Sequence, residues 1–366
     1  MLLVIIFLFI FSILLIILKK KKIVETYANN MVSYFRIKIG VFKEPNFDFH
    51  YKFLKLLSSD IPLEIVQYTN KYEPFYELKK RNIDLALSSE RDYMIYYINQ
   101  NLKKKRTLDD FRKIPKIQLI TAAYHIYFLL VADFDKITNY NQINDKTVQI
   151  NPKHFLGLDV EKELFQNYKV HFKHRNNDLE KAYEDIGNKS SILIHTTIHP
   201  NKLLLEQSNK KEIYLLDAFK VNNNTDFFNK FLFINKTQID LQYYPKILQR
   251  TTSNEIGYKL NTYSTRAILL GLDVLNKTYV YEFMKVYFKK VDEIRDKYSY
   301  FNNFKDSEIS YSRLSLENRV LSFHDGARDF YRRIGNFTYN PDRGCAIISN
   351  ECTNDQLQQF GDYLQW

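Results

Sequence analysis

The chain has 366 residues, of which 45% are hydrophobic and 16% aromatic, so it has ample material for a core and wholesale disorder is excluded. Only 9 residues are glycine, where average usage of about 7% predicts roughly 26. None forms a G-x-G-x-x-G or G-x-x-x-x-G-K-[ST] motif, which excludes dinucleotide fingerprints, Walker-type phosphate loops and kinase glycine-rich loops. The net charge of +11 accompanies many Asn, Lys, Ile, Tyr and Phe residues, as AT-rich coding DNA produces, for instance in a large DNA virus or an AT-rich microbe. We interpret the charge as solvated lysine-rich faces and expect no nucleic-acid partner.

The N-terminal segment predicts a membrane anchor. Residues 1–18 contain a single polar side chain, Ser12, and a helix of this length spans about 27 Å, close to the thickness of a hydrocarbon core. Lys19 to Lys22 follow directly and can extend to the lipid headgroups. No charge precedes the apolar run and no A-x-A pattern follows it, which favours an uncleaved single-pass anchor over a signal peptide. The bilayer is therefore a predicted partner.

The flanking charge predicts the orientation of this anchor. The basic residues lie after the apolar run, so the positive-inside rule places the large domain on the cytoplasmic side of the membrane. Sequons for N-glycosylation would suit the opposite side, but they arise by chance in a chain rich in asparagine, and we give them little weight. They begin at Asn188, Asn223, Asn235, Asn276 and Asn336.

Two blocks of alternating strands and helices follow. The first block has strands at 35–42, 62–68 and 83–89 and helices at 47–57 and 74–82. The second has strands at 125–134, 147–152, 169–174, 191–197 and 212–218 and helices at 157–168, 179–187 and 201–209. From about residue 260 the pattern predicts a mainly helical region, with helices at 265–275, 278–298 and 324–335. This order is typical of parallel sheets covered by helices and predicts an α/β fold with two lobes.

The predicted domain organisation follows these blocks. It comprises the anchor and its basic flank at 1–22, lobe 1 at 35–129, lobe 2 at 130–245, a return to lobe 1 with C-terminal helices at 246–338, and a C-terminal extension at 339–366.

The order of several segments resembles a known family over roughly residues 35–338. These segments are IKIGVF (37–42), ELKKRNIDLALSSERDYMIYY (77–97), the stretch 117–150 that ends in NDKTVQI, the stretch 181–205 with ILIHTTIHPNKLL, and FHDGARDFYRRIG (323–335). They resemble the TAXI branch of TRAP-transporter solute receptors. The resemblance implies a two-lobe periplasmic-binding-protein-like (type II) fold, here with an N-terminal transmembrane helix, and a ligand held in the cleft between the lobes.

The chain departs from that family at the turns that would surround the ligand. Glycine- and serine-rich turns would let backbone N–H groups face an anion, but here the corresponding turns carry bulky or charged residues, at 43–47, 69–72 and 151–155. The resemblance implies a ligand-binding set made of Lys43, Asn46, Thr69, Lys71, Ser88, Ser89, Arg91, His154, His195 and Thr196.

Catalytic and metal-binding patterns are weak. His195 and His199 are four residues apart, but His195 lies at the end of a predicted strand and Pro200 follows His199, so a helical pair of metal ligands does not form. No G-x-S-x-G, H-E-x-x-H or nucleophile–base constellation is present, and we expect no cofactor, no metal and no enzymatic activity. Cys345 and Cys352 are too few for a disulfide framework, and whether they pair with each other stays open.

Two hypotheses for function remain open. In the first, a membrane-anchored solute-binding-like protein captures a small anionic ligand, such as a carboxylate or an amino acid, and its lobes close on it; the transporter partner is unknown. In the second, a non-catalytic structural or interaction protein of a membrane or virion reuses the fold with a degenerate pocket. The missing glycine turns favour the second hypothesis. An enzyme on the same fold is a weaker third interpretation, for which the sequence offers no residues.

Overall fold

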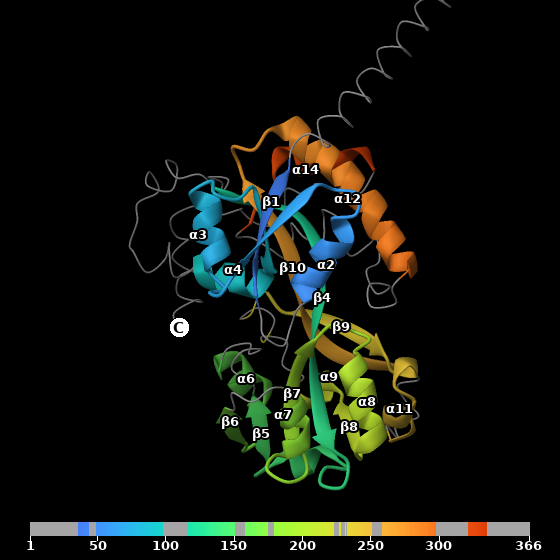
Figure 1. The fold of residues 1–366 in the computed structure, drawn as a ribbon. Coiled ribbons are helices and arrows are strands. Elements are labelled where there is room, and N and C mark those ends of the chain that lie inside the picture. The colour runs from blue at the N-terminus through green and yellow to red at the C-terminus, as the bar shows by residue number, and fades with distance from the viewer. Residues whose placement is uncertain are drawn as a thin grey trace, which may run out of the picture.

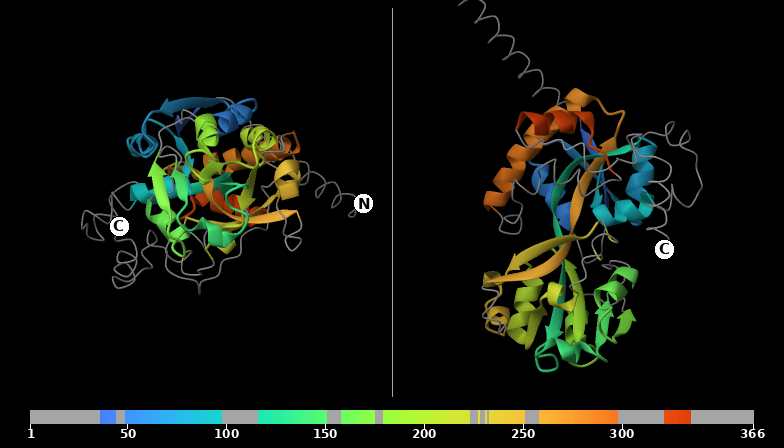
Figure 2. Two further views of the ribbon diagram at one scale, coloured as in Figure 1. Left: turned by 90° about the horizontal axis from the view of Figure 1, so that it is seen from below. Right: turned by 180° about the vertical axis from the view of Figure 1, so that it is seen from behind.

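A computed structural model describes residues 36–43, 49–97, 116–150, 158–174, 179–222, 227, 231, 233–250, 258–297 and 321–334. It contains two α/β lobes, one above the other in Figure 1, joined by the long strands β4 (Ile117–Asp133) and β10 (Lys259–Leu272). The right-hand view of Figure 2 shows the same two lobes from behind. The two-lobe α/β architecture predicted from the alternating pattern is thus confirmed.

The predicted anchor and cysteine pair lie outside the described residues. This applies to residues 1–18, Cys345 and Cys352. Among the helices that the structure describes, none combines the length and the apolar character that a membrane span requires.

Lobe 1 is built on a parallel β-α-β-α-β unit. Its strands are β1 (Ile37–Phe42), β2 (Leu63–Tyr68) and β3 (Leu85–Ser89), in the sheet order β2-β1-β3-β10-β4. Strand β1 runs parallel to both neighbours, and its apolar residues are buried among helices. These helices are α2 (Phe49–Leu57), α3 (Glu73–Lys79), α4 (Glu90–Tyr97), α12 (Lys277–Lys297) and α14 (Asp325–Arg333).

Lobe 2 continues the same sheet in the order β4-β7-β5-β6. Its strands are β5 (Thr147–Ile150), β6 (His171–His174), β7 (Ile192–Thr197), β8 (Ile213–Leu216), which pairs with β4, and β9 (Asn235–Asp240), which pairs with β10. Its helices are α6 (Leu158–Leu164), α7 (Leu179–Asp185), α8 (Lys202–Lys210), α9 (Ala218–Val221) and α11 (Pro245–Arg250), with 3₁₀ turns η2 (Tyr140–Ile143) and η4 (Leu241–Tyr243). Strands β5, β6 and β7 are parallel, as expected for this block.

The helix predicted at 265–275 is wrong, because this segment belongs to strand β10. From Tyr263 to Leu272 every residue of the strand is buried, so both of its faces are covered. A run that is apolar on both faces shows no period of two and cannot be distinguished from a buried helix by pattern alone. Burial of both faces also explains why the sequence predicts a strand only from residue 125, whereas β4 begins at Ile117.

The two linking strands belong to both lobes. Strand β10 pairs with β9 from Lys259 to Ser264 and with β3 from Ala267 to Gly271. The β10–β4 pairing carries two register shifts, one between Ala267 and Ile268 and one two residues later. Such irregularities bend a strand locally and increase its twist. The lobes therefore meet at the middle of a continuous two-stranded ribbon.

Candidate ligand site between the lobes

Strand direction brings the carboxyl ends of both parallel units to the junction of the lobes. In lobe 1, β3 runs antiparallel to β10 and its last residue, Ser89, lies opposite Ala267. In lobe 2, β7 runs antiparallel to β4 and its last residue, Thr197, lies opposite Tyr127. Ala267 is itself paired with Tyr124, three residues from Tyr127, so the two sets of strand ends point towards each other across about 10 Å of β4. Ligands of open α/β sheets bind outside the carboxyl ends of the strands, which makes this junction the candidate site.

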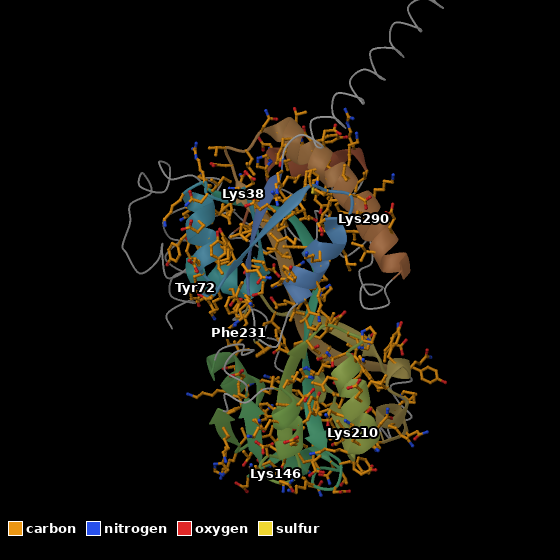
Figure 3. All side chains as sticks on the ribbon, in the orientation of Figure 1. Lys38, Tyr72, Lys146, Lys210, Phe231 and Lys290 are labelled. Carbon is orange, nitrogen blue, oxygen red and sulfur yellow. The ribbon has the colours of Figure 1, made fainter. Side chains whose placement is uncertain are left out.

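The predicted residues of lobe 1 lie at these strand ends. Lys43 follows β1 and Thr69 follows β2, and both are exposed. Ser88 is buried within β3, opposite Ile268. Lys71 stands just before Tyr72, which Figure 3 places at the edge of lobe 1 that faces lobe 2. Asn46 and His154 lie outside the described residues.

Three of the predicted residues come together around Asp92, which the prediction omitted. The Ser89 hydroxyl donates to Asp92 Oδ2 at 2.8 Å, and the Asp92 backbone N–H donates to Ser89 Oγ at 3.1 Å. Lys71 Nζ and Arg91 Nη1 each lie 3.4 Å from Asp92 Oδ1. Asp92 follows Ser89 by three residues at the start of α4, the spacing of a capping box, and this signal could have identified it.

The charges of this cluster control the ionisation of Asp92. Burial alone would raise the pKa of its carboxyl group. The guanidinium of Arg91, the ammonium of Lys71 and the hydroxyl of Ser89 together outweigh burial and hold this pKa below its ordinary value. Asp92 is therefore a carboxylate at neutral pH.

A second, fully buried ion pair joins α4 to the linking ribbon. Arg266 on β10 binds Glu90 as a fork, with Nε 3.0 Å from Oε2 and Nη2 3.1 Å from Oε1. Both side chains are at most 3% exposed. Two parallel hydrogen bonds fix the relative orientation of the guanidinium and the carboxylate and also pair their charges. The pair holds the first residue of α4, and with it Arg91 and Asp92, at a defined position beside the junction.

His50 joins helix α2 to the other linking strand. Its Nδ1 lies 2.5 Å from the hydroxyl oxygen of Tyr124, the residue of β4 that pairs with Ala267. Burial lowers the pKa of His50 to about 4, and the nearby Asp92 carboxylate only partly opposes this. His50 is therefore neutral at physiological pH and acts as a hydrogen-bonding contact between α2 and β4.

The predicted residues of lobe 2 do not join the Asp92 cluster. The ring of His195 is buried, and its Nδ1 lies 2.7 Å from the hydroxyl of Tyr183 on α7, within the core of lobe 2. Thr196 is half-buried at the end of β7. Within the described ranges, no group of three His, Cys, Asp or Glu side chains is placed to hold a metal ion.

Aromatic side chains occupy the lobe 2 side of the junction. Phe231 is fully buried in the lobe 2 core, in ring contact with Phe227 and Phe233. Figure 3 shows Phe231 at the level where the lobes meet. Phe233 packs against the cores of both lobes. The junction therefore combines a charged cluster on lobe 1 with an apolar contact between the lobes.

Comparison with known proteins gives structural likeness alone. No protein-family model matches the chain, and no curated protein matches its sequence. The second substrate-binding domain of GlnP from Lactococcus lactis, in its open conformation, is similar with a TM-score of 0.39 and 8% identity, over 73% of this chain and 92% of that one. The amino acid ABC transporter substrate-binding protein AbpA from Streptococcus pneumoniae, bound to L-arginine, gives 0.35 and 10%, over 74% and 92%. The GluR0 ligand-binding core from Nostoc punctiforme, in complex with L-glutamate, gives 0.35 and 10%, over 71% and 98%.

All three TM-scores are below 0.5, so the lobes are defined by the strand pairing of this chain and not by the likeness to these proteins.

Proposed function

We propose that this protein is a solute-binding protein that holds a small, carboxylate-bearing molecule between its two lobes. The observation that carries the proposal is the convergence of Lys71, Ser89 and Arg91 where the parallel strands of lobe 1 end facing those of lobe 2. Two cations and a hydroxyl donor suit a carboxylate, because charge-assisted hydrogen bonds to an ionised acceptor are the strongest that side chains offer.

The linking ribbon supports closure of the lobes on the ligand. Within the described chain, only β4 and β10 run through both lobes, so bending of this ribbon where the lobes meet would move the lobes as rigid bodies. A ligand that contacts both lobes favours the closed form by its differential affinity for that form. The receptor then captures its ligand without any chemical step, which fits our expectation of a non-enzymatic protein.

The N-terminal sequence and the resemblance of the segments support a proposal for the cellular setting of this receptor. We place it in the TAXI-like group of solute receptors, tethered to a membrane by residues 1–18 with the lobes on the cytoplasmic side. Protease protection of tagged vesicles tests the orientation: digestion of the large domain in sealed inside-out vesicles supports it, and protection of that domain there refutes it.

Thermal unfolding of the full-length protein in detergent micelles tests ligand binding. The panel consists of acetate, succinate, L-glutamate and L-arginine, each at about 1 mM. A ligand with a Kd of about 1 µM would stabilise the protein by about 4 kcal/mol under these conditions. The variant Arg91→Gln serves as the site control and should lose the shift. Absence of a shift with every member of a broadened panel of carboxylates and amino acids would refute the proposal.

A structural or interaction protein with a degenerate pocket is the second candidate function. Two observations favour it: Asp92 already occupies the cations, and Phe233 packs against both lobe cores. In that case the lobes would stay in one relative position, and small-angle X-ray scattering would give the same radius of gyration with and without every ligand tested.

A further inference from the structure

The cation cluster of lobe 1 already holds a carboxylate that belongs to the protein. Asp92 Oδ1 lies 3.4 Å from both Lys71 Nζ and Arg91 Nη1, and its Oδ2 accepts the Ser89 hydroxyl at 2.8 Å. Each oxygen of this carboxylate thus has a donor, in the arrangement that a ligand carboxylate would require at the same place.

The protein cannot offer the same contacts to a second carboxylate. The Ser89 hydroxyl has a single proton, which Asp92 accepts, so a ligand can use this donor only after Asp92 leaves it. Two carboxylates beside the same cations also repel each other. The Arg266 guanidinium is itself engaged with Glu90 in a buried bidentate pair.

The cluster is also partly closed to solvent. The side chain of Asp92 is 13% exposed, that of Arg91 11%, and that of Lys71 32%. Salt screens charge–charge interactions less at a partly buried site than at the surface. The attraction of the Asp92 carboxylate to Lys71 and Arg91 is therefore strong enough to compete with that of a ligand carboxylate. The attachment of Asp92 three residues from Ser89 keeps it permanently within reach.

We propose that Asp92 is an intramolecular competitor that fills the carboxylate subsite of the ligand-free protein, and that a ligand binds by exchange with it. This inference rests on the proposed solute-binding function. It identifies Asp92 as a residue that lowers affinity and thereby sets which carboxylates bind: only those with enough further contacts to displace it.

The test compares the full-length protein with Asp92→Asn and Asp92→Ser by isothermal titration with succinate and L-glutamate. Either substitution removes the competing charge, and the serine variant retains a short polar side chain at the start of α4. We expect affinity for at least one probe to rise tenfold or more in both variants. Circular dichroism checks that each variant is folded.

Asp60→Asn is the matched control, because it removes one negative charge from the same lobe. Asp60 is half exposed and forms an ion pair with Lys290 on α12. Figure 3 labels Lys290 on the side of lobe 1 away from Tyr72. This control separates exchange at the subsite from a general change in net charge, and its affinities should stay within twofold of the parent protein.

The outcomes of the titration separate a failure of exchange from a failure of solute binding. If the parent protein binds a probe, Arg91→Gln abolishes binding, and the Asp92 variants gain nothing or lose affinity, then exchange is refuted while solute binding stands. If Asp60→Asn gains as much as the Asp92 variants, the gain is electrostatic and exchange is likewise refuted. If neither the parent nor any folded Asp92 variant binds succinate, L-glutamate or any member of the broadened panel of carboxylates and amino acids, both proposals fail.

Discussion

Buried neutral histidines should make the stability of this protein depend steeply on pH. Burial lowers the pKa values of His50 and His199 to about 4, and the carboxylates of Asp92 and Asp240 only partly oppose it. His199 is also held neutral by geometry, because the backbone N–H of Asp240 donates to its Nε2 at 3.3 Å and leaves no room there for a proton.

The sign of the effect follows from proton linkage. An unfolded histidine has a pKa of 6.5, so the unfolded chain binds more protons than the folded protein between pH 6.5 and pH 4. The contribution of each histidine to the free energy of unfolding is complete above pH 6.5 and is lost as the pH falls towards 4. At pH 5 the loss is about 2 kcal/mol for each residue, or about 4 kcal/mol for the two together.

The variant His50→Gln removes the contribution of His50 to this pH dependence and leaves that of His199. An amide side chain can keep a hydrogen bond to the Tyr124 hydroxyl but does not titrate. We expect the difference in unfolding free energy between pH 8 and pH 5 to shrink by about 2 kcal/mol relative to the parent. Urea unfolding at both pH values, followed by circular dichroism in one detergent, measures this difference.

His171→Gln is the control for this measurement, because His171 is exposed on β6. The control should leave the pH difference unchanged to within about 0.5 kcal/mol. An equal pH difference in the parent, His50→Gln and His171→Gln would show that His50 carries none of the effect and would refute the reasoning.

Two further substitutions test the packing that positions the site. Glu90→Gln removes one partner of the buried Arg266–Glu90 pair and should cost about 3–5 kcal/mol in urea unfolding. The double variant Glu90→Gln with Arg266→Met should recover much of this loss, and equal losses in both variants would contradict the buried pair. Gly326→Ala would place a Cβ 2.2 Å from the Lys277 carbonyl oxygen, so α14 must move away from α12 at a cost of about 1–3 kcal/mol, and an unchanged urea midpoint would show that this close approach is absent.

Local signals in the sequence were sufficient for much of the fold. The helix predicted to begin at residue 324 is α14, and at its start the Nδ1 of His324 accepts the Gly326 N–H at 3.1 Å. The helix predicted to end at residue 187 is α7, and Gly187 follows it with a φ of +88°, a conformation that glycine adopts without strain. Both features depend on residues that are neighbours along the chain, which is why pattern reasoning finds them.

The contacts that define the site depend instead on residues far apart. Arg266 and Glu90 are 176 positions apart, and neither gives a local signal that it is buried. The capping spacing of Ser89 and Asp92 was visible, but not the approach of Lys71 from the end of another strand. The resemblance implied a place in the site for His195, which lies two residues before the end of β7, yet alternation along the strand turns its ring towards Tyr183.

The scarcity of glycine now has a physical consequence for the candidate site. A glycine-rich turn binds an anion with backbone N–H groups that stay in place when the site is empty. Here long side chains replace them, and an empty pair of cations at a half-buried position would repel each other and lose order. Asp92 counters both effects by pairing with Lys71 and Arg91, and the Tyr72 ring, whose centroid lies 5.1 Å from Lys71 Nζ, adds a second contact. A carboxylate site built from side chains is therefore ordered by the same internal anion that competes with its ligand.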